Sequence, residues 1–388
     1  MTDSVSATKT LFRPGLGLVT ALLSLVLFST ASAQERLERQ YPELAQLFNS
    51  FDVAHAALFE QLVAINNSPQ TRNARSEFQE HMMMLAAMAA DPHGSHGGHG
   101  AHMEMLMNGP YDEMESESRA SVLEIVRGEH SAEQAATAFQ DSETIPMHTA
   151  RVLQLGREFE RKLYEIYLDD SVSDKQAAVD AAVQDYLADE RHSVPTAPKV
   201  YTVLASAPHA TAFQSGFPKL SGLLWANQWL QMAALEAIMV EYRDTQFRNT
   251  VDVVLERYWN KVGSASGMSM FPAPVDLPMS ATITPTLYSF HPQAAVILDN
   301  LNMLETRIAD SMAYPNLDDR EAAIDVAVAE FTDKASNLTR DDDYLLAALR
   351  GGIYNQGGPA VGELNHSERN RSRSEMNMQH TMIMSSPQ

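Results

Sequence analysis

The feature of this sequence that most constrains its fold is a pair of amphipathic helices that occurs twice. Residues 149–168 carry apolar side chains at helical spacing on one face, namely Val152, Leu155, Phe159, Leu163, Ile166 and Tyr167. A polar turn follows, and Asp174 is a good N-cap for a second helix whose inward positions are Val179, Ala182, Val183 and Tyr186. The pattern predicts a helical hairpin.

The same hairpin recurs 145 residues later. The segment AAVDAAVQDY (177–186) aligns without gaps to AAIDVAVAEF (322–331), with five of ten residues identical. The same offset pairs Asp174 with Asp319, Glu160 with Glu305 and Leu163 with Ile308. Alanine-rich helices can match by chance, but one offset that holds across two helices and their turn favours an internal duplication.

The rest of the chain is also predicted to be mostly helical. Helices are expected at 42–65, 74–90, 218–244 and 246–261, and the first two have the format of a third hairpin. Loops are expected at 91–112, 191–217 and 263–291. The stretch KVYTVLAS (199–206) has the composition of an isolated strand. After residue 355 the composition is polar and glycine-rich, which predicts a disordered tail.

The predicted fold class is therefore all-α, with stacked helical hairpins that form bundle-like units, an internal duplication at offset 145 and a disordered C-terminal tail. The predicted segments are a signal peptide (1–33), an N-terminal hairpin (34–90), a His/Met/Gly-rich loop (91–112), a first helical repeat (113–262), a Pro/Ser-rich linker (263–291), a partial second repeat (292–354) and the tail (355–388).

The N-terminus has the pattern of a cleavable export signal. Lys9 and Arg13 precede an apolar run at 15–28, which is short for a membrane span, and a small-residue cleavage pattern ends at Ala33. Cleavage is expected between Ala33 and Gln34, which would place the mature protein in the periplasm or outside the cell. An uncleaved anchor is the alternative.

Charge and cysteine content exclude several kinds of partner and site. The net charge of −22 argues against nucleic acid and against anionic membrane surfaces as partners, because both attract Lys and Arg. The chain has no cysteine, so it has no disulfide and no thiolate metal site. Methionine, present 21 times, is the remaining soft ligand.

Histidine and methionine are concentrated in one segment around the first expected loop. The stretch HGSHGGHGAHMEMLM (93–107) follows a helix that contains His81, and the predicted metal ligands here are His81, His93, His96, His99, His102, Met103, Met105 and Met107. Imidazole suits copper, nickel and zinc, whereas the thioether selects Cu(I). Glycine disfavours a helix, so these side chains would form an adaptable chelate. The alternative is a biased linker beside ordinary core methionines.

A second segment of the same chemistry lies in the tail. MNMQHTMIM alternates its ligands, and in an extended chain alternate residues face one side. The predicted ligands are Met376, Met378, His380, Met382 and Met384. A segment that has no core to fill leaves its methionines without a packing role, which favours metal binding over packing. The alternative is a short interaction segment that docks its apolar side elsewhere.

The sequence does not indicate an enzyme. It lacks Gly-x-Ser-x-Gly, His-Glu-x-x-His, a phosphate-binding glycine loop and an EF-hand. Five further histidines, His55, His148, His192, His209 and His291, are scattered, and a lone histidine is usually structural.

One short motif suggests a different metal. In GEHSAE, Gly128, His130 and Glu133 match the Gly-x-His-x-x-Glu pattern of imelysin-like periplasmic proteins. The chain also resembles those proteins in its expected export, its helical composition and its internal duplication. That resemblance implies an association with iron uptake. The segment lacks the expected apolar continuation, and a helix C-cap with a solvated face is the simpler interpretation.

The first prediction is thus an exported helical protein that binds copper, Cu(I) by methionine and Cu(II) by histidine, for sequestration or for delivery to a copper-handling partner protein. Iron is the less favoured metal. The alternatives are a helical interaction protein whose Met/His segments are incidental, and an imelysin-like iron-associated bundle.

Overall fold

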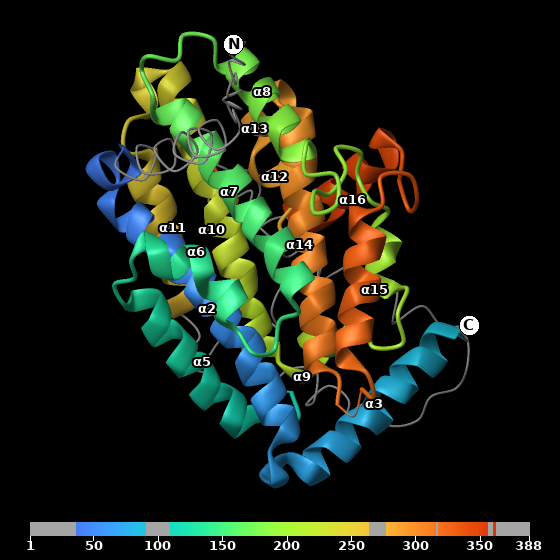
Figure 1. Ribbon diagram of the computed structural model, residues 1–388. Helices are drawn as coiled ribbons and strands as arrows, with labels where there is room; N and C mark the ends of the chain where they lie inside the picture. Colours follow the sequence, from blue (N-terminus) through green and yellow to red (C-terminus); the bar gives the residue numbers. More distant parts are fainter. Residues whose placement is uncertain (1–35, 91–108, 264–276, 316, 356–359, 362–388) are drawn as a thin grey trace, which may run out of the picture.

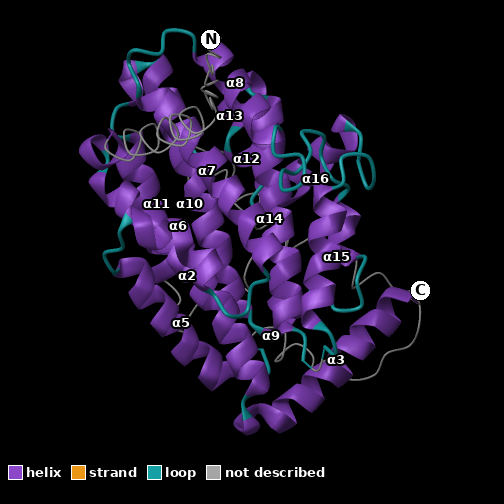
Figure 2. Cartoon of the chain, viewed as in Figure 1, coloured by secondary structure: helices purple, strands orange, loops and turns teal. Residues whose placement is uncertain are grey.

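The structure, a computed structural model, describes residues 36–90, 109–263, 277–315, 317–355 and 360–361. Its helices in chain order are α2 (Pro42–Asn67), α3 (Arg72–Ala90), α5 (Asp112–Arg127), α6 (Ala132–Asp141), α7 (Met147–Leu168), α8 (Lys175–Leu187) and α9 (Ala212–Gly216). They continue with α10 (Pro218–Arg243), α11 (Thr250–Gly263), α12 (Ser280–Ile283), α13 (Pro285–Phe290), α14 (Pro292–Ala313), α15 (Arg320–Thr332) and α16 (Asp341–Asn355). Figure 2 shows helices joined by loops, and the predicted all-α fold is confirmed.

Both predicted hairpins form. Helices α7 and α8 make the first, helices α14 and α15 make the second, and their bounds correspond at the offset of 145. Asp174 accepts a hydrogen bond from the Ala177 N–H at 2.9 Å, and Asp319 accepts one from the Ala322 N–H at 2.9 Å. The two N-caps are therefore confirmed. A common origin of the two hairpins stays a prediction.

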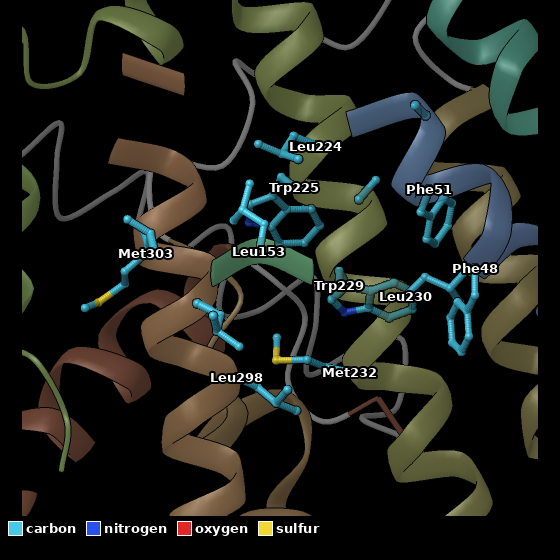
Figure 3. Close-up of a cluster of buried hydrophobic side chains, with 14 of the residues drawn as sticks. Phe48, Phe51, Leu153, Leu224, Trp225, Trp229, Leu230, Met232, Leu298 and Met303 are labelled. Carbon is cyan, nitrogen blue, oxygen red and sulfur yellow. The ribbon is translucent and has the colours of Figure 1, made fainter. Parts of the chain in front are cut away.

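Helix α10 lies near the centre of the molecule (Figure 1) and is surrounded by other helices. Every residue from Leu223 to Met239 is buried, as expected for a helix that is apolar on most sides. Figure 3 shows Trp229 of α10 between Phe51 of α2 and Leu298 of α14. Even so, neither α10 nor any other helix in the described ranges has the length and apolar composition needed to cross a bilayer.

Helices α7 and α14 approach each other closely where a glycine meets a leucine. A Cβ atom on Gly156 would lie 2.8 Å from Leu301 Cδ1, so only a glycine leaves Leu301 its present place. The two residues are 145 apart in sequence. Equivalent positions of the two hairpins therefore contact each other.

The structure corrects the strand predicted at 199–206. Residues Tyr201–Ala205 form a 3₁₀ helix, and the described chain pairs here only through an isolated bridge between Lys199 and Leu338. A strand needs a partner along its length, and the side chain of Lys199 instead donates to the carbonyls of Asp333 (2.7 Å) and Ser336 (2.8 Å). The loops expected at 191–217 and 263–291 contain the short helices α9, α12 and α13.

Gly109 and Gly216 make a close contact, and this contact holds residue 109 against the helical body. Gly109 has a φ of +68°, and a Cβ there would lie 2.7 Å from the Gly216 carbonyl oxygen and 2.8 Å from Pro218 Cδ. A Cβ on Gly216 would lie 2.7 Å from Phe78 Cζ of α3. Phe78 and Gly109, on either side of residues 91–108, are thus held at the same place.

We predict that Gly109→Ala lowers the free energy of unfolding by about 1–3 kcal/mol, because the side chain adds backbone strain and a clash with rigid main-chain atoms. Gly263→Ala is the matched control, since a Cβ there meets nothing within 4 Å. Urea denaturation followed by circular dichroism measures both. Equal midpoints for the two variants would contradict this packing.

Candidate functional site

Most of the predicted metal ligands lie outside the described residues. These are His93, His96, His99, His102, Met103, Met105, Met107, Met376, Met378, His380, Met382 and Met384. Only His81 is described, and it lies on α3 with 5% of its surface exposed. The metal-binding role of all thirteen residues stays a prediction.

Helix α3 is buried only along part of its length. Phe78, His81 and Met82 are buried, whereas the next residue, Met83, is 62% exposed. Met82 is thus an ordinary core methionine, whereas the neighbouring Met83 is not. Leu85, further along α3, is partly buried and also packs against the core.

The residues of the Gly-x-His-x-x-Glu pattern serve a helix junction. Gly128 is the C-cap of α5, and its carbonyl accepts hydrogen bonds from Ser50 Oγ (3.0 Å) and Gln46 Nε2 (3.1 Å) of α2. His130 Nε2 lies 3.0 Å from the Ile125 carbonyl oxygen at the end of α5. Glu133 lies in the first turn of α6 and is exposed. The predicted C-cap and solvated face are confirmed.

The structure brings together a buried ionic cluster that the sequence did not predict. Arg157 of α7 lies at its centre, with Nε 3.2 Å from Asp52 Oδ1 of α2 and Nη1 3.3 Å from Glu160 Oε2. Its Nη2 donates to Glu305 of α14 and lies 3.0 Å from His55 Nδ1 of α2. One guanidinium thus joins three helices that are distant in sequence.

Amides of α10 complete the cluster. Gln231 Nε2 donates to Glu160 at 2.9 Å, Gln228 Nε2 donates to Glu305 at 2.8 Å, and Asn227 Nδ2 lies 3.3 Å from His55 Nε2. All three amides are buried. Since a buried charge is tolerated only when it is paired and hydrogen-bonded, the four helices are tied to one relative position.

Charge balance in the cluster determines which carboxyl group takes up a proton. The guanidinium groups of Arg157 and Arg161 are matched by Asp52 and Glu305, and Arg161 Nη2 lies 2.6 Å from Asp52 Oδ2. Burial raises the pKa of Glu160 to about 7, although Arg157 lowers it. Burial also acts to raise the pKa of Glu305, but the charge of Arg157, the neighbouring His55 and the hydrogen bond from Gln228 together outweigh it and hold the pKa at about 2.

The chemistry of this cluster is that of a scaffold. Its carboxylates are engaged by guanidinium and amide donors. Within the residues that the structure describes, no group of three His, Asp or Glu side chains is arranged to hold a metal ion. The sequence carried a signal for it, because Asp52/His55 and Arg157/Glu160 are polar pairs spaced by three on otherwise apolar helix faces.

A second set of buried carboxylates caps helices that lack caps of their own. The N-cap side chains of α9, α10, α12 and α13 make no capping hydrogen bond. Carboxylates from other helices accept from their N–H groups instead: Asp310 from Phe213 (2.9 Å), Glu115 from Lys219 (2.6 Å), Asp299 from Ser280 (2.8 Å) and Glu236 from Thr286 (3.0 Å).

Burial outweighs these hydrogen bonds in setting the protonation of the capping groups. It raises the pKa of Glu115 to about 8, that of Asp310 to about 7 and that of Asp299 to about 6. Asp299 also accepts from Tyr344, which lines a half-open pocket of about 190 Å³ together with Lys199 and Met279. All of these carboxyl groups bond to the protein itself.

Comparison with known proteins gives no relative. No protein-family model, no curated protein and no solved structure matches this chain.

We predict that Arg157→Ala lowers the free energy of unfolding by about 3–5 kcal/mol, because it leaves buried carboxylates without a cation. Arg151→Ala, on the same helix, is the control. Its partner Glu158 lies 3.3 Å away at the surface, and an exposed pair of this kind contributes less than about 1 kcal/mol. Similar losses for the two variants in urea denaturation would argue against the cluster as a structural centre.

We predict that the thermal midpoint falls as the pH rises from about 5 to 8. Glu160, Glu115, Asp310 and Asp299 have raised pKa values in the folded state, so the folded protein binds more protons than the unfolded chain over this range, and its stability decreases with pH. Glu305 acts in the opposite direction, but its contribution is lost only as the pH falls from about 4 towards 2. Burial also lowers the pKa of His209 to about 4 and lowers that of His291, and these two groups oppose the fall below about pH 6.5. The midpoint should therefore fall most steeply between about pH 6.5 and 8.

Calorimetry of Glu160→Gln tests this assignment. The glutamine keeps the shape of the side chain but removes its titration, so the decrease in midpoint between pH 5 and 7 should become smaller. Glu158→Gln at the surface of α7 is the control and should run parallel to the unmodified protein. An unchanged slope in Glu160→Gln would show that this group does not titrate in that range.

Proposed function

We propose that this protein is an exported helical scaffold that binds copper through its two Met/His-rich segments, for sequestration or delivery. Methionine thioethers of residues 103–107 and 376–384 would hold Cu(I), and the histidines of residues 93–102 would hold Cu(II). The signal-like residues 1–33 support a periplasmic or secreted location. Delivery would require a copper-handling partner protein.

The composition of the two segments is the main support. A chain without cysteine has methionine as its soft donor, and both segments combine it with histidine. Neither segment repeats the apolar-periodic pattern of the helical body. Their ligand types therefore fit a mobile chelate better than a rigid catalytic site.

The single structural observation in favour is that the chain packs against the helical body at one residue before and one residue after the first segment, and at one residue before the second. Phe78 and Gly109, on either side of the first segment, pack at Gly216. Before the second segment, the Ala360 N–H donates to the Ile283 carbonyl oxygen at 2.9 Å, and Arg257 Nη1 donates to the Ala360 carbonyl oxygen at 2.5 Å. Anchored segments keep their ligands at high effective concentration around one molecule.

We predict that removal of residues 91–107 and 376–388 strongly reduces copper bound per molecule, as measured by titration of the mature protein with Cu(I) and Cu(II). Replacement of the four tail methionines by leucine should reduce Cu(I) binding alone. Asparagine at His93, His96, His99 and His102 should reduce Cu(II) binding alone. Below about pH 6 the histidine contribution should fade, whereas Cu(I) binding to the tail should persist, since thioethers do not titrate.

Met147→Leu is the control for the methionine variants, because Met147 is 70% exposed but belongs to neither segment. Unchanged copper stoichiometry in the deletion variant would overturn the proposal and leave an interaction protein with incidental Met/His segments. Loss of iron uptake in His130→Ala would instead favour the iron-associated alternative.

A further inference from the structure

Two histidines that are 44 positions apart in the sequence face each other on the helical body. His148 lies in the first turn of α7, and His192 follows α8 in the same hairpin. Their ring centroids are 5.0 Å apart and the rings are tilted by 54°. Both side chains are partly exposed, so a small solute can reach them.

One of the two rings is oriented by a carboxylate. Asp189 Oδ1 lies 2.8 Å from His192 Nδ1, which leaves Nε2 of His192 for a further partner. A carboxylate on the far nitrogen of an imidazole is the usual outer-shell arrangement of a metal-binding histidine, because it fixes the tautomer and the ring orientation.

The other ring has an unsatisfied nitrogen. His148 Nδ1 is buried from solvent and has no hydrogen-bond partner among the described residues. Buried polar atoms without a partner are uncommon in folded proteins and point to a strained, functional or ion-binding position.

The spacing of the rings fits one shared metal ion. A nitrogen ligand lies about 2.0 Å from Zn²⁺, so the centroid of its imidazole lies about 3.2 Å from the metal. Two such rings at a tetrahedral angle have centroids about 5 Å apart. The observed 5.0 Å matches this separation.

We propose that His148 and His192 bind a divalent cation of the borderline class, Zn²⁺ or Cu²⁺, with Asp189 as the orienting group. The protein supplies two ligands, and water or an exogenous ligand fills the remaining positions, so the ion is exchangeable. Asp189 and Asp325 contribute negative charge near the pair, and Arg151 and Arg191 contribute positive charge. The site uses no residue of either Met/His segment and is independent of the proposed function.

Calorimetric titration with Zn²⁺ tests the site in the full-length protein. The background carries asparagine at His93, His96, His99, His102 and His380, so that the two segments offer no imidazole. We predict one equivalent of bound Zn²⁺ in this background, its loss in His148→Ala and in His192→Ala, and about a 10-fold weaker affinity in Asp189→Asn. Cu²⁺ in the same background should show two coupled imidazole nitrogens in its electron paramagnetic resonance spectrum.

His130→Ala is the matched control, since His130 is also partly exposed but bonds to the end of α5. The His130→Ala variant should still bind one equivalent of Zn²⁺, and circular dichroism should show that all variants fold. Absence of Zn²⁺ binding in the background, or an equivalent that survives both His148→Ala and His192→Ala, would overturn the proposal. Neither result bears on copper binding by the two segments.

Discussion

The interaction on which the rest of this structure depends is the burial of the Arg157 guanidinium. Its partners are Asp52, Glu160 and Glu305, which come from α2, α7 and α14, and amides of α10 donate to Glu160 and Glu305. Apolar contacts alone tolerate a helix that slides by a fraction of a turn. A buried charge does not, because each shift would leave it unpaired at low dielectric. The ionic cluster therefore fixes the positions of the four helices relative to one another, and the large hydrophobic core packs around it.

The same principle governs where four other helices begin. Helices α9, α10, α12 and α13 start at N–H groups that are bonded by Asp310, Glu115, Asp299 and Glu236 of other helices. None of these starts has a capping hydrogen bond from its own N-cap side chain, so each is completed only when its partner on another helix is in place. Local order and tertiary order are thus coupled, which favours cooperative unfolding.

This coupling explains what the sequence could predict. The hairpins α7/α8 and α14/α15 were predictable because their apolar periodicity and their caps Asp174 and Asp319 are local. The start of α12 was not, because its cap Asp299 lies 19 residues further along the chain. Arg157 could be noticed in the sequence only because it and Glu160 are polar residues spaced by three on an otherwise apolar helix face. The sequence does not show which carboxylates of other helices will surround it. His148 and His192 looked scattered for the same reason, since the turn of the hairpin brings them together.

The contact between Gly156 and Leu301 has a consequence for how such a chain can evolve. The two residues occupy equivalent positions of the predicted duplication, and so do Glu160 and Glu305, which share the single Arg157. In a symmetric pair of identical hairpins, each residue near the two-fold axis would meet a copy of itself. A large side chain would then face the same large side chain, and an arginine would face an arginine. Joining the two hairpins in one chain removes that restriction. One copy can then carry the glycine and the arginine while the other carries the leucine that packs on that glycine and a second glutamate for that arginine.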